Sequence, residues 1–274
     1  MECDVVLATG VTHQYRAGGR NVDALRGLTL SVPRGSWTML VGRSGAGKST
    51  LLGLLSGQIE WYGTGEISLE GKSLRVLDGS SRARMLFQVR QDPLTSTAPD
   101  LTVAEHLVLA DSCPESRQKS WIHRARDTCF PLRSAHTGSF SSLLREHGLA
   151  EYLDAPVAEL SGGERQLLVL LLAHLRRVPF LILDEPLSNV DDVHARRCLE
   201  VLHRLNQAGT TILMVTHDLH VACAHGDRLA CVGAGRTLAE FAGAAKNELA
   251  PSRLWELMET AEINISSARG AVDA

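Results

Sequence analysis

The sequence has 274 residues, of which 44% are hydrophobic, so it can bury a core of domain size. Its formal net charge of -3 at pH 7 argues against nucleic acid as the main partner, because proteins that grip a phosphate backbone carry an excess of positive charge. The six cysteines have neither zinc-like nor paired spacing and predict reduced thiols in a cytosolic compartment. No secretory signal is expected, and the longest apolar run, 167–173, is far shorter than the roughly 20 residues that cross a bilayer.

Short segments bounded by glycines or polar residues predict two kinds of strand. Residues 28–32 and 65–71 alternate in polarity, which is typical of a small antiparallel sheet. Trp37–Val41, 180–183 and Thr211–Val215 are short apolar runs, which indicate buried parallel strands. Ligands of parallel sheets bind outside the carboxyl ends of the strands, so we expect one nucleotide site to collect the three loops that follow these runs.

Residues 92–160 have leucine and valine at helical spacing, and they predict an inserted helical subdomain. Its middle part, 112–142, is polar and mildly basic. Two interpretations stay open for this part: a solvated surface excursion, or a contact with a partner or with anionic lipid.

A glycine-rich loop follows the first buried strand, and a leucine-rich helix follows the loop. The pattern G-x-x-x-x-G-K-[ST] in this context is that of a phosphate-binding loop, whose backbone N–H groups and helix N-terminus surround the anion. We expect Lys48 to bridge the β- and γ-phosphates and Ser49 to bind Mg²⁺. The residues assigned to the nucleotide are Gly42, Arg43, Ser44, Gly45, Ala46, Gly47, Lys48, Ser49 and Thr50.

Two carboxylates, Asp184 and Glu185, stand at the end of the second buried strand. Charge in such a place is costly without a cation. We therefore expect Asp184 to hold Mg²⁺, directly or through water, and Glu185 to orient or deprotonate the attacking water. The alternative is that the pair only caps the following helix.

A second glycine-bearing helix start lies at 160–166, with the sequence LSGGERQ. Ser161 and Glu164 match a capping box, which by itself explains a helix start. Capping does not require two consecutive glycines, however, and Gly162 and Gly163 would expose backbone N–H groups as a second anion site. Since one chain rarely needs two γ-phosphate sites, we expect this one to serve a nucleotide held by another subunit.

These motifs, in this order and followed by Thr216, His217 and Asp218, resemble those of ABC ATPases over residues 7–240. The resemblance implies an α/β fold with a phosphate-loop NTPase core and parallel sheet, a small antiparallel β subdomain and the inserted helical subdomain at about 92–160. The ATPase domain would span 1–250, with a C-terminal helix and frayed tail at 251–274. The resemblance also implies ATP and Mg²⁺ as cofactors. Two copies would pair head to tail, with Ser161, Gly162 and Gly163 of one contacting the γ-phosphate held by the other.

The resemblance assigns further positions. Tyr15 would stack on the base, which admits GTP beside ATP, although an ordinary surface or core tyrosine is the alternative. His217 would hydrogen-bond the γ-phosphate, and we expect most other histidines on the surface. Gln91 is preferred over Gln88 as the glutamine that senses Mg²⁺ and couples to the membrane subunit, because it follows a predicted strand and leads into the helical subdomain. Residues 188–191 would cross the dimer interface, with a departure from the family pattern that leaves their detailed contact open.

Two rival classes fit the motifs less well. A GTPase or small-molecule kinase would lack a use for 160–166, and no N-K-x-D guanine motif is present. A soluble ABC ATPase of repair or translation usually carries two cassettes in one chain or a long coiled-coil insertion, and neither is found.

Within transport, 91–107 is similar to ATPases of importers of tryptophan/tyrosine type or of unknown substrate, whereas 15–25 is similar to lipoprotein-releasing and efflux ATPases. The resemblance implies a peripheral subunit on the cytoplasmic face of the cell (inner) membrane that drives transmembrane permease subunits. We expect import, fed by an extracytoplasmic solute-binding protein, with release or efflux as the alternative.

Overall fold

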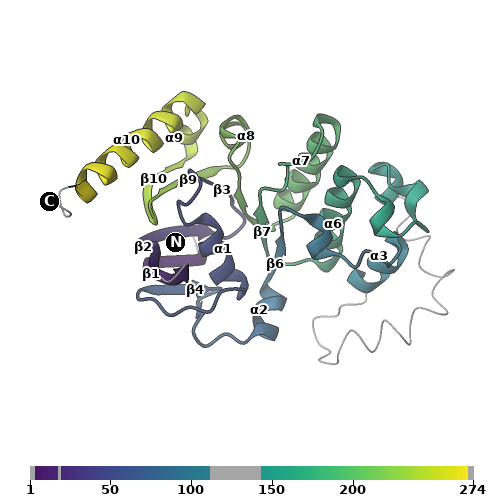
Figure 1. Ribbon diagram of the computed structural model, residues 1–274. Coiled ribbons are helices and arrows are strands. Elements are labelled where there is room, and N and C mark those ends of the chain that lie inside the picture. The colour runs from purple at the N-terminus through teal and green to yellow at the C-terminus, as the bar shows by residue number, and fades with distance from the viewer. Residues whose placement is uncertain (1–3, 18–19, 112–142, 271–274) are drawn as a thin grey trace. The chain divides into compact units, whose positions relative to one another are not determined.

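The computed structural model describes residues 4–17, 20–111 and 143–270 (Figure 1). The polar segment 112–142 and the last four residues lie outside the described residues. The chain divides into two compact units. The first comprises 1–88, 179–186 and 206–274, and the second comprises 89–178 and 187–205.

Two β-sheets form the framework of the first unit. A four-stranded antiparallel sheet has the order β2-β1-β4-β5, and a six-stranded sheet has the order β10-β9-β3-β8-β7-β6. The strands β7, β8, β3 and β9 pair in parallel, and β10 pairs antiparallel to β9. The three predicted apolar strands are confirmed as β3, β7 and β8. The strands are β1 Asp4–Ala17, β2 Arg20–Pro33, β3 Trp37–Val41, β4 Glu66–Leu69, β5 Lys72–Ser73, β6 Leu86–Val89, β7 Phe180–Asp184, β8 Thr211–Val215, β9 Arg228–Gly233 and β10 Arg236–Ala242.

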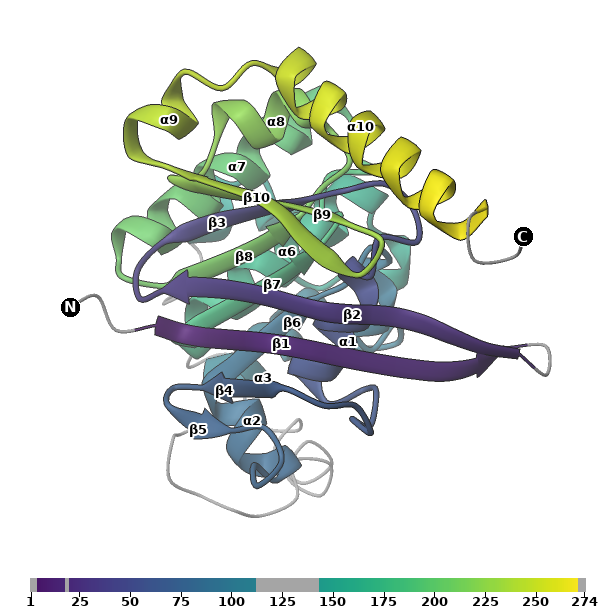
Figure 2. The same cartoon turned by 90° about the vertical axis from the view of Figure 1, so that its left-hand side faces the viewer.

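Helix α1, Lys48–Ser56, joins the two sheets into one core. Its leucines belong to the same buried cluster as the inward side chains of the long β1–β2 hairpin and of the six-stranded sheet. Figure 2 shows the hairpin as two long strands near the N-terminus. The helix that begins at the phosphate-binding loop is therefore held from both sides. Its buried leucines are Leu51, Leu52, Leu54 and Leu55.

The first unit ends in a helical segment. Helix α10, Pro251–Gly270, packs against β9 and α8, Leu219–Ala224, with Leu254 and Met258 buried. In α9, Gly243–Asn247, the buried Lys246 ammonium donates to the carbonyl oxygens of Cys223 and His225 at 2.8 and 2.7 Å. A short helix α2, Gly79–Met85, precedes β6. Among the described residues, no helix combines the length and apolar character that a membrane span requires.

The second unit is helical. Its main helices are α3, Val103–Asp111, α6, Gly162–Arg176, and α7, Asp192–Gln207, whose last two residues belong to the first unit. Helix α3 packs against α6, which buries most of its apolar side chains. Residues 143–146 add a helical turn. The short 3-10 turns are η1 Pro93–Ser96, η2 Ala150–Tyr152 and η3 Val157–Glu159.

The expectation that most histidines lie on the surface is wrong for His13, His106 and His147, which are buried. His106 shows why burial is tolerated. Its Nδ1 lies 2.9 Å from the carbonyl oxygen of Thr102, and its Nε2 accepts the N–H of Ala98 at 3.0 Å. The backbone thus satisfies both ring nitrogens, which sequence spacing does not reveal.

Candidate nucleotide site

Two glycines of the phosphate-binding loop are required by packing within the chain. Gly47 caps α1 with φ 101°, a left-handed conformation, and a Cβ there would lie 2.6 Å from the carbonyl oxygen of Ala24. A Cβ on Gly42 would lie 2.2 Å from the carbonyl oxygen of Val232. The loop is therefore clamped between β2 and β9.

Backbone hydrogen bonds add to this clamp. The N–H of Gly235, in the turn between β9 and β10, donates to the carbonyl oxygen of Ala46 at 3.0 Å. The N–H of Arg26 in β2 donates in turn to the carbonyl oxygen of Gly235 at 2.8 Å. The loop shape is thus fixed by the protein itself, and its N–H groups do not have to be ordered when an anion binds.

Lys48, the first residue of α1, is buried and folds back over the loop. Its ammonium donates to the carbonyl oxygens of Gly42 and Arg43 at 2.6 and 3.0 Å. Burial lowers the pKa of Lys48, whereas the neighbouring carboxylates Glu185 and Asp184 act to raise it. A phosphate chain in the loop would offer this cation stronger acceptors than neutral carbonyl groups.

Asp184 ends β7, and Glu185 follows it in a strained conformation. Glu185 has φ 49°, and its N–H donates to the carbonyl oxygen of Val215 at the end of β8 at 3.0 Å. Its carboxylate lies 3.0 Å from Nδ1 of His217. A non-glycine residue at positive φ costs on the order of 1–3 kcal/mol and is concentrated at functional sites. The carboxylate thus lies beside His217, after the ends of the paired strands β7 and β8.

Burial, followed by the charge of Glu185, raises the pKa of Asp184, and Lys48 opposes the rise. The charged form of Asp184 is therefore favoured by additional positive charge nearby, as a divalent cation would supply. Ser49 offers an exposed hydroxyl one residue after Lys48. A Ser hydroxyl, a carboxylate and phosphate oxygens make a donor set that suits Mg²⁺, so the residues present fit this ion.

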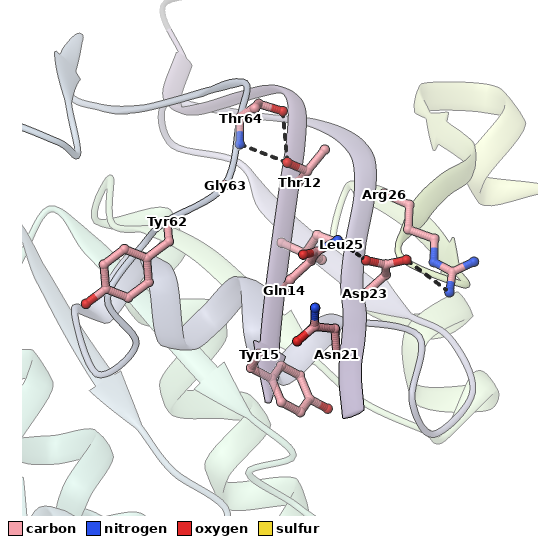
Figure 3. Close-up of a pocket in the computed structure, with 10 residues that line it drawn as sticks. All are labelled: Thr12, Gln14, Tyr15, Asn21, Asp23, Leu25, Arg26, Tyr62, Gly63 and Thr64. Carbon is pink, nitrogen blue, oxygen red and sulfur yellow. Dashed lines mark hydrogen bonds and ion pairs between the residues drawn. The ribbon is translucent and has the colours of Figure 1, made fainter. Parts of the chain in front are cut away.

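A pocket of about 710 Å³ lies at the β1–β2 hairpin and the loop before β4 (Figure 3). Tyr15 is 48% exposed at one end, beside Asn21, and Tyr62 stands on the opposite loop. Leu25 lines the pocket and also contacts the phosphate-binding loop, since a Cβ on Gly47 would lie 2.8 Å from its Cδ2. The pocket therefore adjoins the phosphate-binding loop.

The predicted capping box is confirmed at the start of α6. The Ser161 hydroxyl accepts the N–H of Glu164 at 3.3 Å, and the Glu164 carboxylate accepts the N–H of Ser161 at 2.7 Å. The N–H groups of Gly162 and Gly163 have no acceptor within the helix, because they belong to its first turn. The functional interpretation of these glycines stays a prediction beside the structural one.

The two candidate glutamines have different surroundings. Gln88 lies in β6, and its carboxamide oxygen accepts a hydrogen bond from Gln58. Gln91 follows β6 and is exposed. The first unit thus brings together Tyr15, residues 42–50, the two carboxylates and His217, whereas Gln91 and residues 161–163 belong to the second unit.

Two side chains next to these motifs were missed by sequence reasoning. The guanidinium of Arg43 lies 5.3 Å from the ring centroid of Trp255, an exposed tryptophan on α10. His194, near the start of α7, lies against Gly163. Neither contact has a signal in the sequence, because each one joins segments that are distant along the chain.

The chain matches the ABC transporter family over residues 25–188. It belongs to this family as an ATP-binding and ATP-hydrolysing subunit. The ABC ATPase is 33% identical to an aliphatic sulfonates import ATP-binding protein of Agrobacterium fabrum over 82% of this chain and 76% of that protein. It is 30% identical to a tyrosine transport ATP-binding protein of Clostridioides difficile over 85% of this chain and 90% of that protein. It is also 32% identical to a lipoprotein-releasing system ATP-binding protein of Caulobacter vibrioides over 82% of this chain and 92% of that protein.

Solved structures agree with the fold. An ATP-binding subunit of an ABC transporter superposes with a TM-score of 0.72 at 26% identity, covering 92% of this chain and 99% of that chain. A second structure is an ATP-binding cassette solved as a dimer in a post-hydrolysis state, bound to ADP and Pi. It superposes with a TM-score of 0.68 at 23% identity and covers 86% of this chain and 98% of that chain. The predicted ABC ATPase fold is therefore confirmed.

Proposed function

We propose that two copies of this ATPase hydrolyse ATP to drive a separate permease that imports a small solute. The catalytic part of the proposal rests on the Glu185 carboxylate, which is held at the strand edge by a strained backbone and hydrogen-bonded to His217. Glu185 is the base that orients or deprotonates the attacking water, and His217 faces the γ-phosphate. Lys48 neutralises the β- and γ-phosphates, and Tyr15 stacks on the base.

Ser49 and Asp184 are proposed to hold Mg²⁺ together with the phosphates, and Gln91 to sense the ion. When bound, the ion supplies charge stabilisation to the phosphoryl group that is transferred. The raised pKa of Asp184, caused first by burial, supports this assignment because a cation would favour the charged carboxylate.

The N-terminus of α6 is proposed to act on the ATP of a second copy. Gly162 is partly exposed, and its N–H lies in the first helical turn, where it is free to face an anion. The chain already has a complete phosphate site at α1. A head-to-tail pair of copies would give each ATP a phosphate-binding loop from one copy and the α6 start from the other.

Gln91 is the proposed link to the permease. The segment after it is ordered by the chain itself, since the Asp92 carboxylate accepts the N–H of Leu94 at 3.0 Å and His106 accepts the N–H of Ala98. A segment fixed in this way can transmit a displacement to docked permease helices. Gln88 is less suited to this role because its carboxamide is engaged by Gln58.

Import is favoured by the relatives, of which three are named for import or transport of sulfonates, tyrosine or iron(3+)-hydroxamate. An amino acid is the leading proposal for the solute, supplied by an extracytoplasmic binding protein. The lipoprotein-releasing relative, at 32% identity, keeps release or efflux as the second candidate. The proposed location is the cytoplasmic face of the membrane, through the permease.

Purification of the tagged subunit from membranes tests the assignment. We expect a permease to co-purify and to stimulate hydrolysis, and Gln91→Ala to abolish most of that stimulation without changing ATP affinity. Gln88→Ala is the matched control and should keep the stimulation, whereas the reverse pattern would move the coupling role to Gln88. Recovery of ribosomes or DNA without any permease would replace the transport assignment by a soluble ABC ATPase.

A further inference from the structure

The two glycines at the start of α6 have different surroundings within their own chain. A Cβ added to Gly163 would lie 2.6 Å from Cγ, 2.8 Å from Cβ and 3.0 Å from Nδ1 of His194. A Cβ added to Gly162 would meet only the carbonyl oxygen of Asn189, at 3.5 Å. Gly163 is therefore closed off by the imidazole ring, whereas Gly162 has room for a methyl group.

The imidazole of His194 is itself held in place. Its Nδ1 lies 2.6 Å from one carboxylate oxygen of Asp191, and the other oxygen accepts the N–H groups of Val193 and His194 at 3.0 and 3.1 Å. Hydrogen bonds from His194, first through its N–H and then through its ring, lower the pKa of Asp191. Asp191 is therefore a carboxylate at neutral pH and fixes the ring orientation.

One side chain thus connects two segments that are distant in sequence. Asp191 ends the segment 188–191, which the family resemblance places across the dimer interface, and Gly163 lies in the first turn of α6. Both segments belong to the same compact unit. Because close-packed groups cannot move independently without opening a void, a displacement of residues 188–191 is transmitted through His194 to the first turn of α6.

We propose that His194 is a positioning residue of the dimer-dependent nucleotide site, which ties the N–H groups of Gly162 and Gly163 to the position of residues 188–191. The inference rests on the proposed function, in which these N–H groups face the γ-phosphate of the partner copy. Gly163 is a glycine because the ring fills the space of its Cβ, and Gly162 is the position that stays open. A misplacement of about 1 Å at such a site can lower the rate about 100-fold.

A double-mutant cycle tests the contact. In the Glu185→Gln background, Gly163→Ala should raise the ATP concentration for half-maximal dimerisation, measured by light scattering, by about 10-fold or more, because the new methyl group displaces the ring. When His194→Ala is also present, adding Gly163→Ala should change the midpoint by less than about 3-fold. Equal factors in the two backgrounds would show that Gly163 serves the phosphate alone and would overturn the proposal.

Gly162→Ala is the matched control, since its methyl group does not reach residue 194. Its effect on the dimerisation midpoint should be the same with His194 and with Ala at that position. Binding of a fluorescent ATP analogue to the monomer should be unchanged in every variant, because the phosphate-binding loop belongs to the other unit. Loss of this monomer binding in the His194 variants would indicate general misfolding and contradict a positioning role.

The contact with Asp191 is tested by two substitutions of similar reach. His194→Asn keeps a donor for the carboxylate and should restore dimerisation to within about 3-fold of the parent, whereas His194→Leu keeps bulk without a donor and should not. Identical behaviour of the two variants would remove Asp191 from the proposal.

If the Glu185→Gln parent fails to dimerise with ATP, the proposed nucleotide sandwich itself is wrong. If it dimerises and the cycle is additive, only the role of His194 is wrong.

Discussion

The N-termini of α1 and α6, which we propose as two anion sites, differ in construction. Gly47 caps α1 in a left-handed conformation, without a side-chain hydrogen bond, so the first N–H groups of the helix stay available. Helix α6 has a capping box, in which Ser161 already accepts the N–H of Glu164. The first site also carries the buried cation Lys48, whereas the carboxylate of Glu164 stands at the second.

This difference matches the two roles proposed for these helix starts, a complete phosphate site at α1 and a supplementary one at α6. The α1 start leaves its N–H groups to the ligand and adds a positive charge, which suits a whole phosphate chain. The α6 start satisfies part of its own backbone and leaves the N–H groups of Gly162 and Gly163, which suits an additional contact with one phosphate group. The proposed sandwich uses one of each for every nucleotide.

The largest effect is expected from a variant that lowers the rate of ATP hydrolysis at the α1 site without changing ATP affinity. Glu185→Gln should lower ATP turnover by about 100-fold to 10,000-fold, the usual contribution of a general base, while ATP affinity is retained. Phosphate release by the permease complex measures turnover, and equilibrium binding of a fluorescent ATP analogue measures affinity.

Lys48→Ala is the contrasting variant, since it removes the cation and not the base. It should weaken ATP binding itself, with a melting temperature measured alongside because the residue is buried. If Glu185→Gln hydrolyses ATP as fast as the parent, Glu185 is not the base. If Lys48→Ala binds ATP as tightly as the parent, the cation does not distinguish the α1 site from the α6 site.

Much of the first unit could be predicted because its local signals agree with one another. Trp37–Val41 is an apolar run followed by a glycine loop and a leucine-rich helix, and the structure has strand, loop and helix in that order. The hairpin was harder to predict. The strands β1 and β2 have 14 residues each, far beyond the predicted 28–32. Their outer part, which includes Gln14, Tyr15 and residues 21–23, is exposed and is held by pairing between the strands, so no apolar pattern marks it.

The side chains that join separate segments could not be predicted. His194 meets Gly163 only because α6 and α7 are neighbours in the fold, and Arg43 meets Trp255 only because α10 returns toward the phosphate-binding loop. The positive φ of Glu185 is equally hidden, since nothing in the residue type requires it. Such contacts depend on tertiary packing, and sequence periodicity records only which face of an element is buried.

A smaller effect is expected from the capping box that distinguishes α6. Ser161→Ala should lower the free energy of unfolding by about 1 kcal/mol, because the N–H of Glu164 loses its acceptor, and Ser161→Thr should keep most of it. Urea unfolding followed by circular dichroism measures both. Equal stability of the two variants would mean that the box contributes nothing and that the two helix starts differ only in charge.

The smallest effect concerns pH and compares the two units. Burial lowers the pKa of His13 in the first unit and, as the largest cause, that of His106 and His147 in the second, from the ordinary value of 6.5. The folded protein therefore keeps these rings neutral at a pH where the unfolded chain already binds protons. Stability should be full above about pH 6.5, decline as pH falls below it, and stop declining once the folded rings are also protonated.

The second unit, with two of these histidines, should lose more of its stability in this range. Hydrogen exchange at pH 7.5 and pH 5.5 can compare α3 with β3, and we expect the larger loss of protection in α3. His106 is the sharper probe, because a proton on Nε2 would break the bond from the N–H of Ala98. His106→Gln should therefore flatten the pH dependence of α3. A flat profile for the parent between these pH values would show that the buried rings do not resist protonation.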